Sequence, residues 1–297
     1  MTIPIAHGSF PPMITPMTAD ASAIDPVGIK ALIDWHIDAG TTGAFVVCGT
    51  GEMFRLTPDE MVEVVDAAVK ASAGRIPVVA GLPFPSVEQR HALAKRYEEV
   101  GASGAVALQP WEEEYNDDAW YEHYMKIAEG VDIPFMIYEH PKWNDTLLTP
   151  SLVGRLASSG RYVGMKDCTG DLGRLAAMAK AGEGRFGVMQ AVQERLLSAI
   201  LCGGTGACAT ASNAGPALYR RVYDLVQEGK ILEAWDAQKK IRELVPMYGK
   251  AGGGNGTKHM LNKMGLPIHT SWRSGKELTE EQITAGDALI AFLQKVI

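Results

Sequence analysis

The stretch Tyr162-Val163-Gly164-Met165-Lys166-Asp167-Cys168-Thr169-Gly170-Asp171 places a lysine at the end of a short apolar run. Residues 162–166 predict a strand that Lys166 ends. An amine held against apolar surface is poorly solvated when charged, which lowers its pKa and leaves more of the nucleophilic neutral form. Lys166 is therefore a candidate Schiff-base catalyst. The alternative is a surface lysine whose stem lies along apolar surface, and the rest of the sequence decides between the two.

Similar short runs recur along the chain and alternate with segments of helical period, which is typical of βαβ units and a parallel sheet. The predicted strands are Phe10 to Thr15, Gly43 to Val47, Pro77 to Gly81, Gly104 to Leu108, Pro134 to Tyr138, Tyr162 to Lys166, Phe186 to Gln190 and Gly206 to Ala209. Eight strands, each followed by a helix, favour an α/β fold of the closed (β/α)₈ type, because closure removes exposed sheet edges. An open doubly wound sheet is the alternative.

Several predicted helices have recognisable starts. Asp25-Pro26 supplies a cap and a first-turn proline, and Gly40 ends that helix. Thr57-Pro58-Asp59-Glu60 and Ser86-Val87-Glu88-Gln89 predict capping boxes, and Thr149-Pro150 repeats the cap-and-proline pattern.

After the eighth predicted strand, only amphipathic segments follow, at 214–229, 231–249, 257–265 and 278–296. We expect a barrel domain over residues 1–229 and a small helical subdomain over 230–297. The glycine-rich run at 252–258 lacks the Gly-Lys-Thr order and the preceding strand of a phosphate loop. It predicts a flexible joint or a helix start.

Composition limits the classes of partner. The 297 residues are 46% hydrophobic and 21% charged, which is ordinary for a globular protein with a large core. A net charge of -7 without blocks of like charge indicates no nucleic-acid or anionic-membrane surface. No apolar run approaches the roughly 20 residues needed to span a bilayer and no signal pattern begins the chain, so a cytoplasmic location is expected.

The four cysteines are too few and too irregularly spaced for a disulfide scaffold or a Cys-x-x-Cys metal site. Cys48, Cys168, Cys202 and Cys208 are therefore predicted to be small core residues.

In (β/α)₈ barrels the chemistry lies where strands end and βα loops begin. This chain places there Thr15-Pro16, Gly49-Thr50-Gly51-Glu52, Pro110-Trp111, Tyr138, Lys166 and residues 210–213. The glycine loop can present backbone N–H groups and a hydroxyl to a carboxylate, although a generic glycine turn has the same composition. Tyr138 could shuttle protons beside a Schiff-base lysine, or be an aromatic core residue.

Five motifs spread over nearly the whole chain carry a family resemblance. They are Pro12-x-x-Thr15-Pro16, the Gly-Thr-Gly-Glu loop running into Leu56-Thr57-Pro58, Tyr138-x-x-Pro141, Gly164-x-Lys166-Asp167-x-Thr169-Gly170-Asp171 and Gly203-Gly204-x-Gly206. By these motifs the chain resembles the dihydrodipicolinate synthase / N-acetylneuraminate lyase family of class I aldolases.

The resemblance implies an imine between Lys166 and the C2 carbonyl of pyruvate or another 2-oxo acid. It implies that Tyr138 moves protons and that Thr50, with nearby backbone N–H groups, holds the carboxylate. Asp167 would be a structural neighbour, and Glu52 would brace the loop. The chemistry would need no metal or organic cofactor, and the assembly would be a homotetramer built from two dimers.

Three departures from the synthase pattern narrow the substrate. Gly49 stands where the synthases usually carry a threonine, and Trp111 stands where they carry a tyrosine. Their arginine after the Tyr-Asn-x-Pro motif is missing, and Lys142 lies one position off. An arginine would clamp a second carboxylate with two hydrogen bonds, so its loss argues against a doubly anionic product.

The Gly-Thr-Gly-Glu-x-Phe loop resembles that of aldolases and dehydratases acting on 2-keto-3-deoxy sugar acids, which is the favoured function. Trp111 and Trp143 could instead wall a pocket for an aryl or alkyl aldehyde, as in a hydratase-aldolase. His140 could donate to a substrate hydroxyl or simply face solvent. The remaining alternatives are a 4-hydroxy-tetrahydrodipicolinate synthase, a non-catalytic 2-oxo-acid-binding protein and a lysine that holds pyridoxal phosphate. The predicted substrate-binding residues are Thr15, Gly49, Thr50, Gly51, Trp111, His140 and Trp143.

Overall fold

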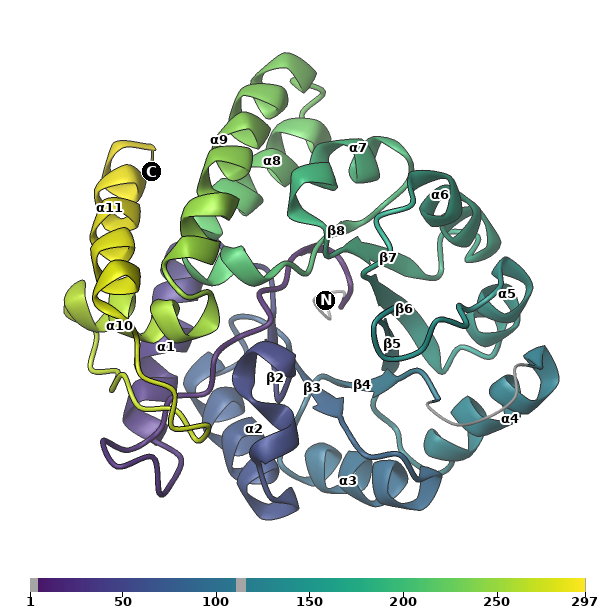
Figure 1. The fold of residues 1–297 in the computed structure, drawn as a ribbon. Helices are drawn as coiled ribbons and strands as arrows, with labels where there is room; N and C mark the ends of the chain where they lie inside the picture. The colour runs from purple at the N-terminus through teal and green to yellow at the C-terminus, as the bar shows by residue number, and fades with distance from the viewer. Residues whose placement is uncertain (1–4, 111–115, 297) are drawn as a thin grey trace.

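A computed structural model describes residues 5–110 and 116–296. Its eight strands form one parallel sheet in the order β1-β8-β7-β6-β5-β4-β3-β2. They are β1 Gly8–Ser9, β2 Ala44–Val46, β3 Val78–Leu82, β4 Gly104–Leu108, β5 Phe135–Glu139, β6 Tyr162–Asp167, β7 Gly187–Gln190 and β8 Gly206–Ala207. The predicted (β/α)₈ barrel with a C-terminal helical part is confirmed (Figure 1).

The barrel closes between the chain's first strand segment and β2. Pro12 forms a parallel bridge with Phe45, and the Met13 N–H donates to the Phe45 carbonyl over 2.8 Å. The regular β1 strand is nevertheless shorter and earlier than the predicted 10–15. Pro11 and Pro12 have no N–H to donate, so a continuous ladder cannot pass through them.

One helix follows each strand, and Figure 1 shows these helices surrounding the sheet. They are α1 Pro26–Asp38, α2 Pro58–Ser72, α3 Val87–Glu99, α4 Asp117–Ile127, α5 Pro150–Ser158, α6 Leu172–Ala181, α7 Leu196–Leu201 and α8 Pro216–Gln227. The side chains of Asp25, Thr57, Ser86 and Thr149 cap their helices as predicted. The box at Thr57 is complete, whereas at Ser86 the bond from the Gln89 N–H is the one present.

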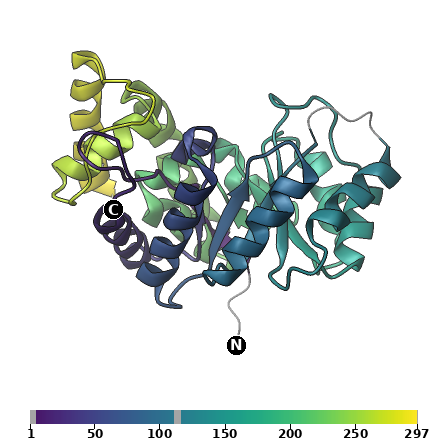
Figure 2. The ribbon, with the colours of Figure 1, turned by 90° about the horizontal axis from the view of Figure 1, so that it is seen from below.

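Three more helices follow, α9 Ile231–Lys250, α10 Gly254–Lys263 and α11 Glu280–Val296. The long α9 packs on α8 and also contacts α7, while α11 packs on α9 and α10. Figure 2 shows these helices gathered at one side of the barrel. The glycine-rich run thus begins a helix at Gly254, the second of its two sequence-based interpretations.

Candidate active site

The lysine and the tyrosine singled out by the sequence lie side by side at the ends of neighbouring strands. Tyr138 on β5 is in register with Lys166 on β6. The lysine is 3% exposed and the tyrosine 5%. The Lys166 Nζ lies 4.1 Å from the centroid of the Tyr138 ring and 5.6 Å from that of Phe45. Lys166 is therefore a buried amine packed on aromatic faces, and not a surface lysine.

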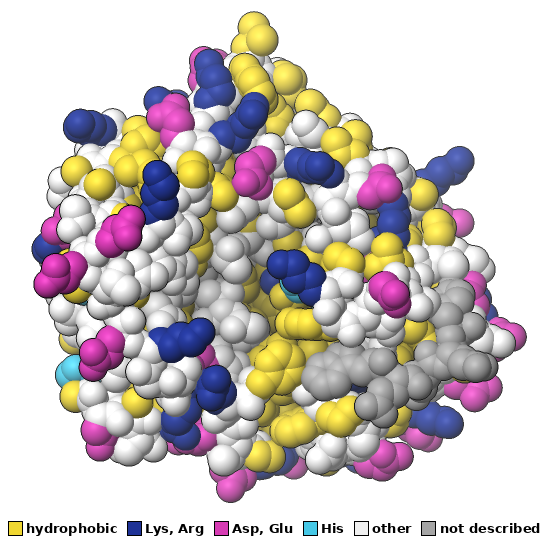
Figure 3. All heavy atoms as spheres, in the orientation of Figure 1, with side chains coloured by type: hydrophobic (Ala, Val, Ile, Leu, Met, Phe, Trp, Pro, Cys, Tyr) yellow, Lys and Arg dark blue, Asp and Glu magenta, His cyan; other side chains and the backbone are white. Residues whose placement is uncertain are grey.

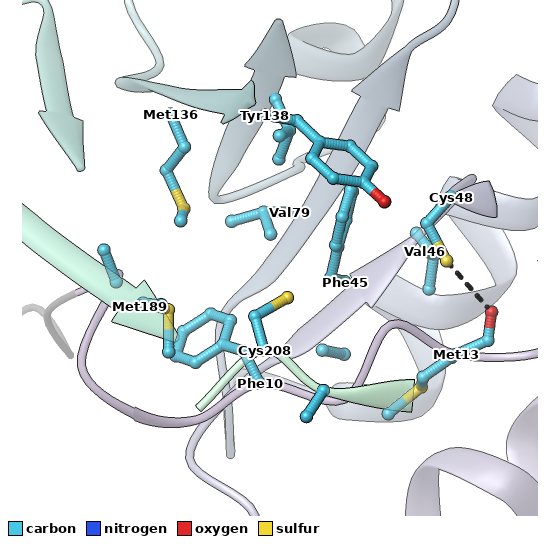
Figure 4. Packing of buried hydrophobic residues seen from close by; sticks show 14 of the residues in the cluster. Phe10, Met13, Phe45, Val46, Cys48, Val79, Met136, Tyr138, Met189 and Cys208 are labelled. Carbon is cyan, nitrogen blue, oxygen red and sulfur yellow. Dashed lines mark hydrogen bonds between the residues drawn. The ribbon is translucent and has the colours of Figure 1, made fainter. Parts of the chain in front are cut away.

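Three thiols surround this amine, which the sequence did not lead us to expect. Cys48 and Cys208 are buried and Cys168 is half-buried, and the charge of Lys166 acts on all three. Figure 4 shows Tyr138, Cys48 and Cys208 in the barrel interior, with Cys48 donating to the Met13 carbonyl over 3.3 Å.

The core prediction holds for two of the four cysteines and is wrong for Cys202, which is exposed at the end of α7. The sequence did carry a signal that these three thiols lie near the lysine, because Cys48, Cys168 and Cys208 come one or two residues after β2, β6 and β8.

Opposing influences act on the pKa of Lys166. Burial is the largest and lowers it, but negative charge on Tyr138, Cys208 and Cys168 together outweighs burial and raises the pKa above its ordinary value. Those charges form only at high pH, because burial raises the pKa of Tyr138, that of Cys168 to about 11 and that of Cys208 to about 12. Near pH 7 the phenol and thiols are neutral, so burial acts on the amine unopposed.

The loop after β2 forms two short 3₁₀ turns, η1 Gly49–Gly51 and η2 Met53–Arg55. The Gly51 N–H donates to the Cys48 carbonyl, and Thr15 Oγ1 donates to the Gly51 carbonyl over 2.8 Å. A Cβ on Gly51 would lie 2.7 Å from that hydroxyl oxygen, so the close approach needs glycine. Within the described residues, the N–H groups of Gly49 and Thr50 donate to no backbone oxygen.

Glu52 holds this loop from behind. Its backbone is left-handed, with φ of 59°, and its carboxylate accepts the N–H groups of Arg273 and Ser274 at 3.2 and 3.0 Å. The bracing role expected for Glu52 is confirmed by these bonds. A Cβ placed on Gly254 would lie 3.5 Å from Thr50, so the C-terminal part supports the loop at two places.

An aromatic wall lies beside the phenol. The Trp143 ring is 4.9 Å from Tyr138, 4.8 Å from His140, on which it stacks, and 5.7 Å from Phe54. A Cβ on residue 49 would lie 3.9 Å from the indole, so the wall borders the glycine loop. The predicted Trp111 lies outside the described residues. Figure 3 shows a hollow at the centre of this face of the molecule, with hydrophobic side chains on part of its rim.

His140 belongs to the same wall. Its Nδ1 accepts the N–H of Lys142 at 3.2 Å, and its pKa is lowered by burial and by the charges of Lys166 and Lys142. The imidazole is therefore neutral at pH 7, with Nε2 able to donate. Lys142 itself is exposed.

Two buried carboxylates lie directly behind the site, and one of them, Glu139, was not singled out by the sequence. Glu139 follows Tyr138 and receives both ends of the Arg174 guanidinium, at 2.6 and 2.8 Å. Asp167 follows Lys166 and accepts the N–H and hydroxyl of Thr169 at 2.8 and 2.7 Å, which confirms its predicted structural role.

In the part of the chain that the structure describes, no group of three or more potential metal ligands occurs and no helix is long and apolar enough to cross a membrane.

A parallel (β/α)₈ barrel that buries a lysine amine against a phenol at its strand ends defines the class of Schiff-base-forming lyases. Comparison with known proteins agrees. The sequence matches the dihydrodipicolinate synthetase family over residues 6–290, and the chain belongs to that family.

Its relatives include 4-hydroxy-tetrahydrodipicolinate synthases. The one from Neisseria meningitidis is 34% identical over 243 residues, 82% of each chain, and the one from Thiobacillus denitrificans is 32% identical over 248 residues, 84% of this chain and 82% of the other.

Solved structures of the family superpose closely. The dihydrodipicolinate synthase from Acinetobacter baumannii, complexed with pyruvate, has a TM-score of 0.88 and 26% identity, covering 98% of this chain and 100% of the other. The prophage protein YagE from E. coli, also in complex with pyruvate, has a TM-score of 0.87 and 25% identity, covering 99% of both chains.

Proposed function

We propose that Lys166 forms an imine with the C2 carbonyl of a 2-oxo acid. The neutral Nζ adds to C2 while Tyr138 carries a proton from nitrogen to the developing hydroxyl, which gives a carbinolamine. Tyr138 then donates its phenol proton to that hydroxyl, which leaves as water, and solvent returns a proton to the phenol. The resulting protonated imine draws electrons from the adjacent carbon, so the bond between C3 and C4 can break, or a C4 hydroxyl can leave. The observation that carries this proposal is the in-register, buried contact between the lysine and the phenol.

The carboxylate of the 2-oxo acid would bind at η1. The N–H groups of Gly49 and Thr50, which donate to no backbone oxygen, and the Thr50 hydroxyl would supply donors for an anion. Gly51 and Thr15 would act indirectly, because the hydrogen bond between them shapes the turn that presents these donors.

For the distal part of the substrate, we propose a 2-keto-3-deoxy sugar acid. The His140 Nε2 offers a neutral donor for a hydroxyl. The arginine expected from the synthase pattern is absent from this chain's Tyr138-x-x-Pro141 motif, which disfavours a second carboxylate and therefore a 4-hydroxy-tetrahydrodipicolinate synthase activity.

A hydratase-aldolase that releases an apolar aldehyde is the second candidate. The stacked rings of Trp143 and His140, with Phe54 beside them, form an aromatic face that suits a flat group.

A substrate panel separates the two candidates. Purified protein is assayed with 2-keto-3-deoxy sugar acids, with aryl-substituted 2-oxo acids and with pyruvate plus aspartate semialdehyde. The first candidate predicts that kcat/KM is highest for a sugar acid, with either pyruvate or a dehydrated oxo acid as product. Higher kcat/KM for an aryl compound would select the second candidate, and the highest value for aspartate semialdehyde would reject both.

We propose in addition that the chain assembles as a homotetramer of two dimers. Apolar side chains are exposed together at the start of α9, where Leu232 is 84% exposed beside Ile231 and Trp235. Sedimentation velocity on the protein and on Leu232→Glu tests whether this surface is an interface. A dimer or monomer in the variant supports the assignment, and a monomeric parent protein would reject it.

A further inference from the structure

Four buried polar side chains form a girdle one residue beyond the inward-facing layer of the site. The girdle consists of Gln109, Glu139, Asp167 and Gln190, at the ends of β4, β5, β6 and β7. Because successive residues of a strand point to opposite faces, the girdle faces outward where Tyr138 and Lys166 face inward.

Each member of the girdle accepts a backbone N–H from a βα loop. Gln109 accepts that of His140, Glu139 that of Leu148, Asp167 that of Thr169 and Gln190 that of Val192, at 2.5 to 2.8 Å. The girdle thus ties the loops at the barrel mouth to the strands that carry the phenol and the amine.

Arg174 of α6 joins the two central members. Its guanidinium binds both oxygens of Glu139, lies 3.8 Å from an Asp167 oxygen and donates to the Leu148 carbonyl over 2.7 Å. The Glu139 side chain is fully buried and that of Arg174 is 15% exposed. Burial raises the pKa of Glu139, so its carboxylate depends on this guanidinium for its charge.

We propose that Arg174 is a positioning residue for the lyase reaction. By holding Glu139 and Asp167, the residues that follow Tyr138 and Lys166, it fixes the phenol relative to the amine. The inference rests on the proposed function, because it concerns the same amine and phenol. Arg174 contacts neither of them, and it lies on the opposite side of the barrel wall from the reacting groups.

The clamp sets the relative position of the phenol and the amine, so its loss should lower the rate of the chemical step. A displacement of about 1 Å in a catalytic group can cost about 100-fold in rate. We expect Arg174→Met to lower kcat by about 100-fold, and to lower the rate of imine trapping by borohydride with pyruvate to the same extent. The KM for the 2-oxo acid should change about 3-fold or less, because the proposed carboxylate site at η1 follows β2 and not the clamped strands β5 and β6. Arg174→Lys keeps the charge without the two-pronged geometry and should recover part of the rate.

A double variant separates positioning from stability. Arg174→Met leaves the Glu139 carboxylate buried without its partner, which destabilises the fold. Adding Glu139→Gln removes that charge and should restore the melting temperature, yet kcat should stay low because no clamp is present. Arg185→Met is the control, since Arg185 pairs with Glu183 at the surface.

The inference is overturned if Arg174→Met keeps full kcat, or if the double variant recovers kcat together with its melting temperature. Failure of the proposed function looks different, because the parent protein itself would then give no adduct on Lys166.

Discussion

At the residue scale, the account depends on how Lys166 and Tyr138 share one buried site. The phenol is protonated at neutral pH, and burial raises its pKa further, so it can donate a proton and take one back without a standing charge. The ring also supports the amine through its aromatic face, 4.1 Å from Nζ. The proposed mechanism therefore gives Tyr138 a chemical role beside its packing role, and substitution can separate the two.

Tyr138→Phe removes the hydroxyl and leaves the ring against Phe45 and Trp143. We expect kcat to fall by about 100- to 10,000-fold, the usual share of a general acid–base group. Tyr97→Phe is the matched control, because that buried hydroxyl donates to the Gly81 carbonyl far from the amine. Its loss should cost about 1 kcal/mol of stability and leave kcat intact. Steady-state kinetics and thermal unfolding of both variants check this, and an active Tyr138→Phe would contradict the proton role.

At the element scale, the turn η1 is shaped by bonds from distant parts of the chain. Thr15 and Glu52 hold it from two sides, and the N–H groups of Arg273 and Ser274 complete the second contact. A turn that contains Gly49 and Gly51 does not settle into one conformation by itself, since glycine loses much conformational freedom on ordering. The orientation of the carboxylate donors is therefore set by these partners.

Glu52→Gln replaces one carboxylate oxygen by an NH₂ group, which cannot accept the second N–H. One half-buried donor loses its hydrogen-bond partner, which should cost about 1 kcal/mol and loosen the turn. We expect the KM for pyruvate to rise about 10-fold with a smaller change in kcat. Glu63→Gln, on the exposed face of α2, should leave KM unchanged. An unaltered KM in Glu52→Gln would show that the turn needs no brace.

At the scale of the whole molecule, the C-terminal helices form part of the site's support. Lys258 on α10 is fully buried, donates to the Ser271 carbonyl over 2.7 Å and lies 4.0 Å over the Trp272 ring. Ser271 in turn donates to the Thr18 carbonyl, 253 positions earlier in the chain. The predicted boundary near residue 229 thus separates the barrel helices from the C-terminal helices along the sequence. In space the two parts are joined, because residues 271–274 form hydrogen bonds to Thr18 and Glu52 in loops of the barrel.

Burial lowers the pKa of Lys258 to about 8, although the charge of Glu52 opposes the shift. An unfolded chain would keep the ordinary lysine pKa, so between about pH 8 and pH 10.5 the unfolded state binds more protons and stability rises with pH. We expect the protein to gain about 3 kcal/mol relative to Lys258→Met across this window. Denaturant unfolding at several pH values measures the difference. Lys250 is exposed on α9 and serves as the control, so the free energy of unfolding of Lys250→Met should follow that of the parent protein across this window. If the free energies of unfolding of the parent and of Lys258→Met changed with pH in parallel, the account of a buried amine would be contradicted.

The whole molecule also shows what sequence could predict. Strand runs, caps and the positions of Tyr138 and Lys166 follow from local patterns, so the barrel and the placement of these two side chains at its strand ends could be predicted. The Arg174 clamp joins residues 35 positions apart, and the Glu52 bond to Ser274 spans 222 positions. Charged residues in those contexts look like ordinary surface positions, because only the closed barrel brings them together. The girdle was hidden for the same reason.

The most direct test of the central claim is borohydride reduction in the presence of pyruvate, followed by peptide mass spectrometry. A reduced pyruvyl group should be found on Lys166, should be absent from Lys166→Ala and should persist in Lys142→Ala, while turnover of the true substrate is lost in Lys166→Ala alone. An adduct on a different lysine, or full turnover by Lys166→Ala, would contradict the assignment of this amine.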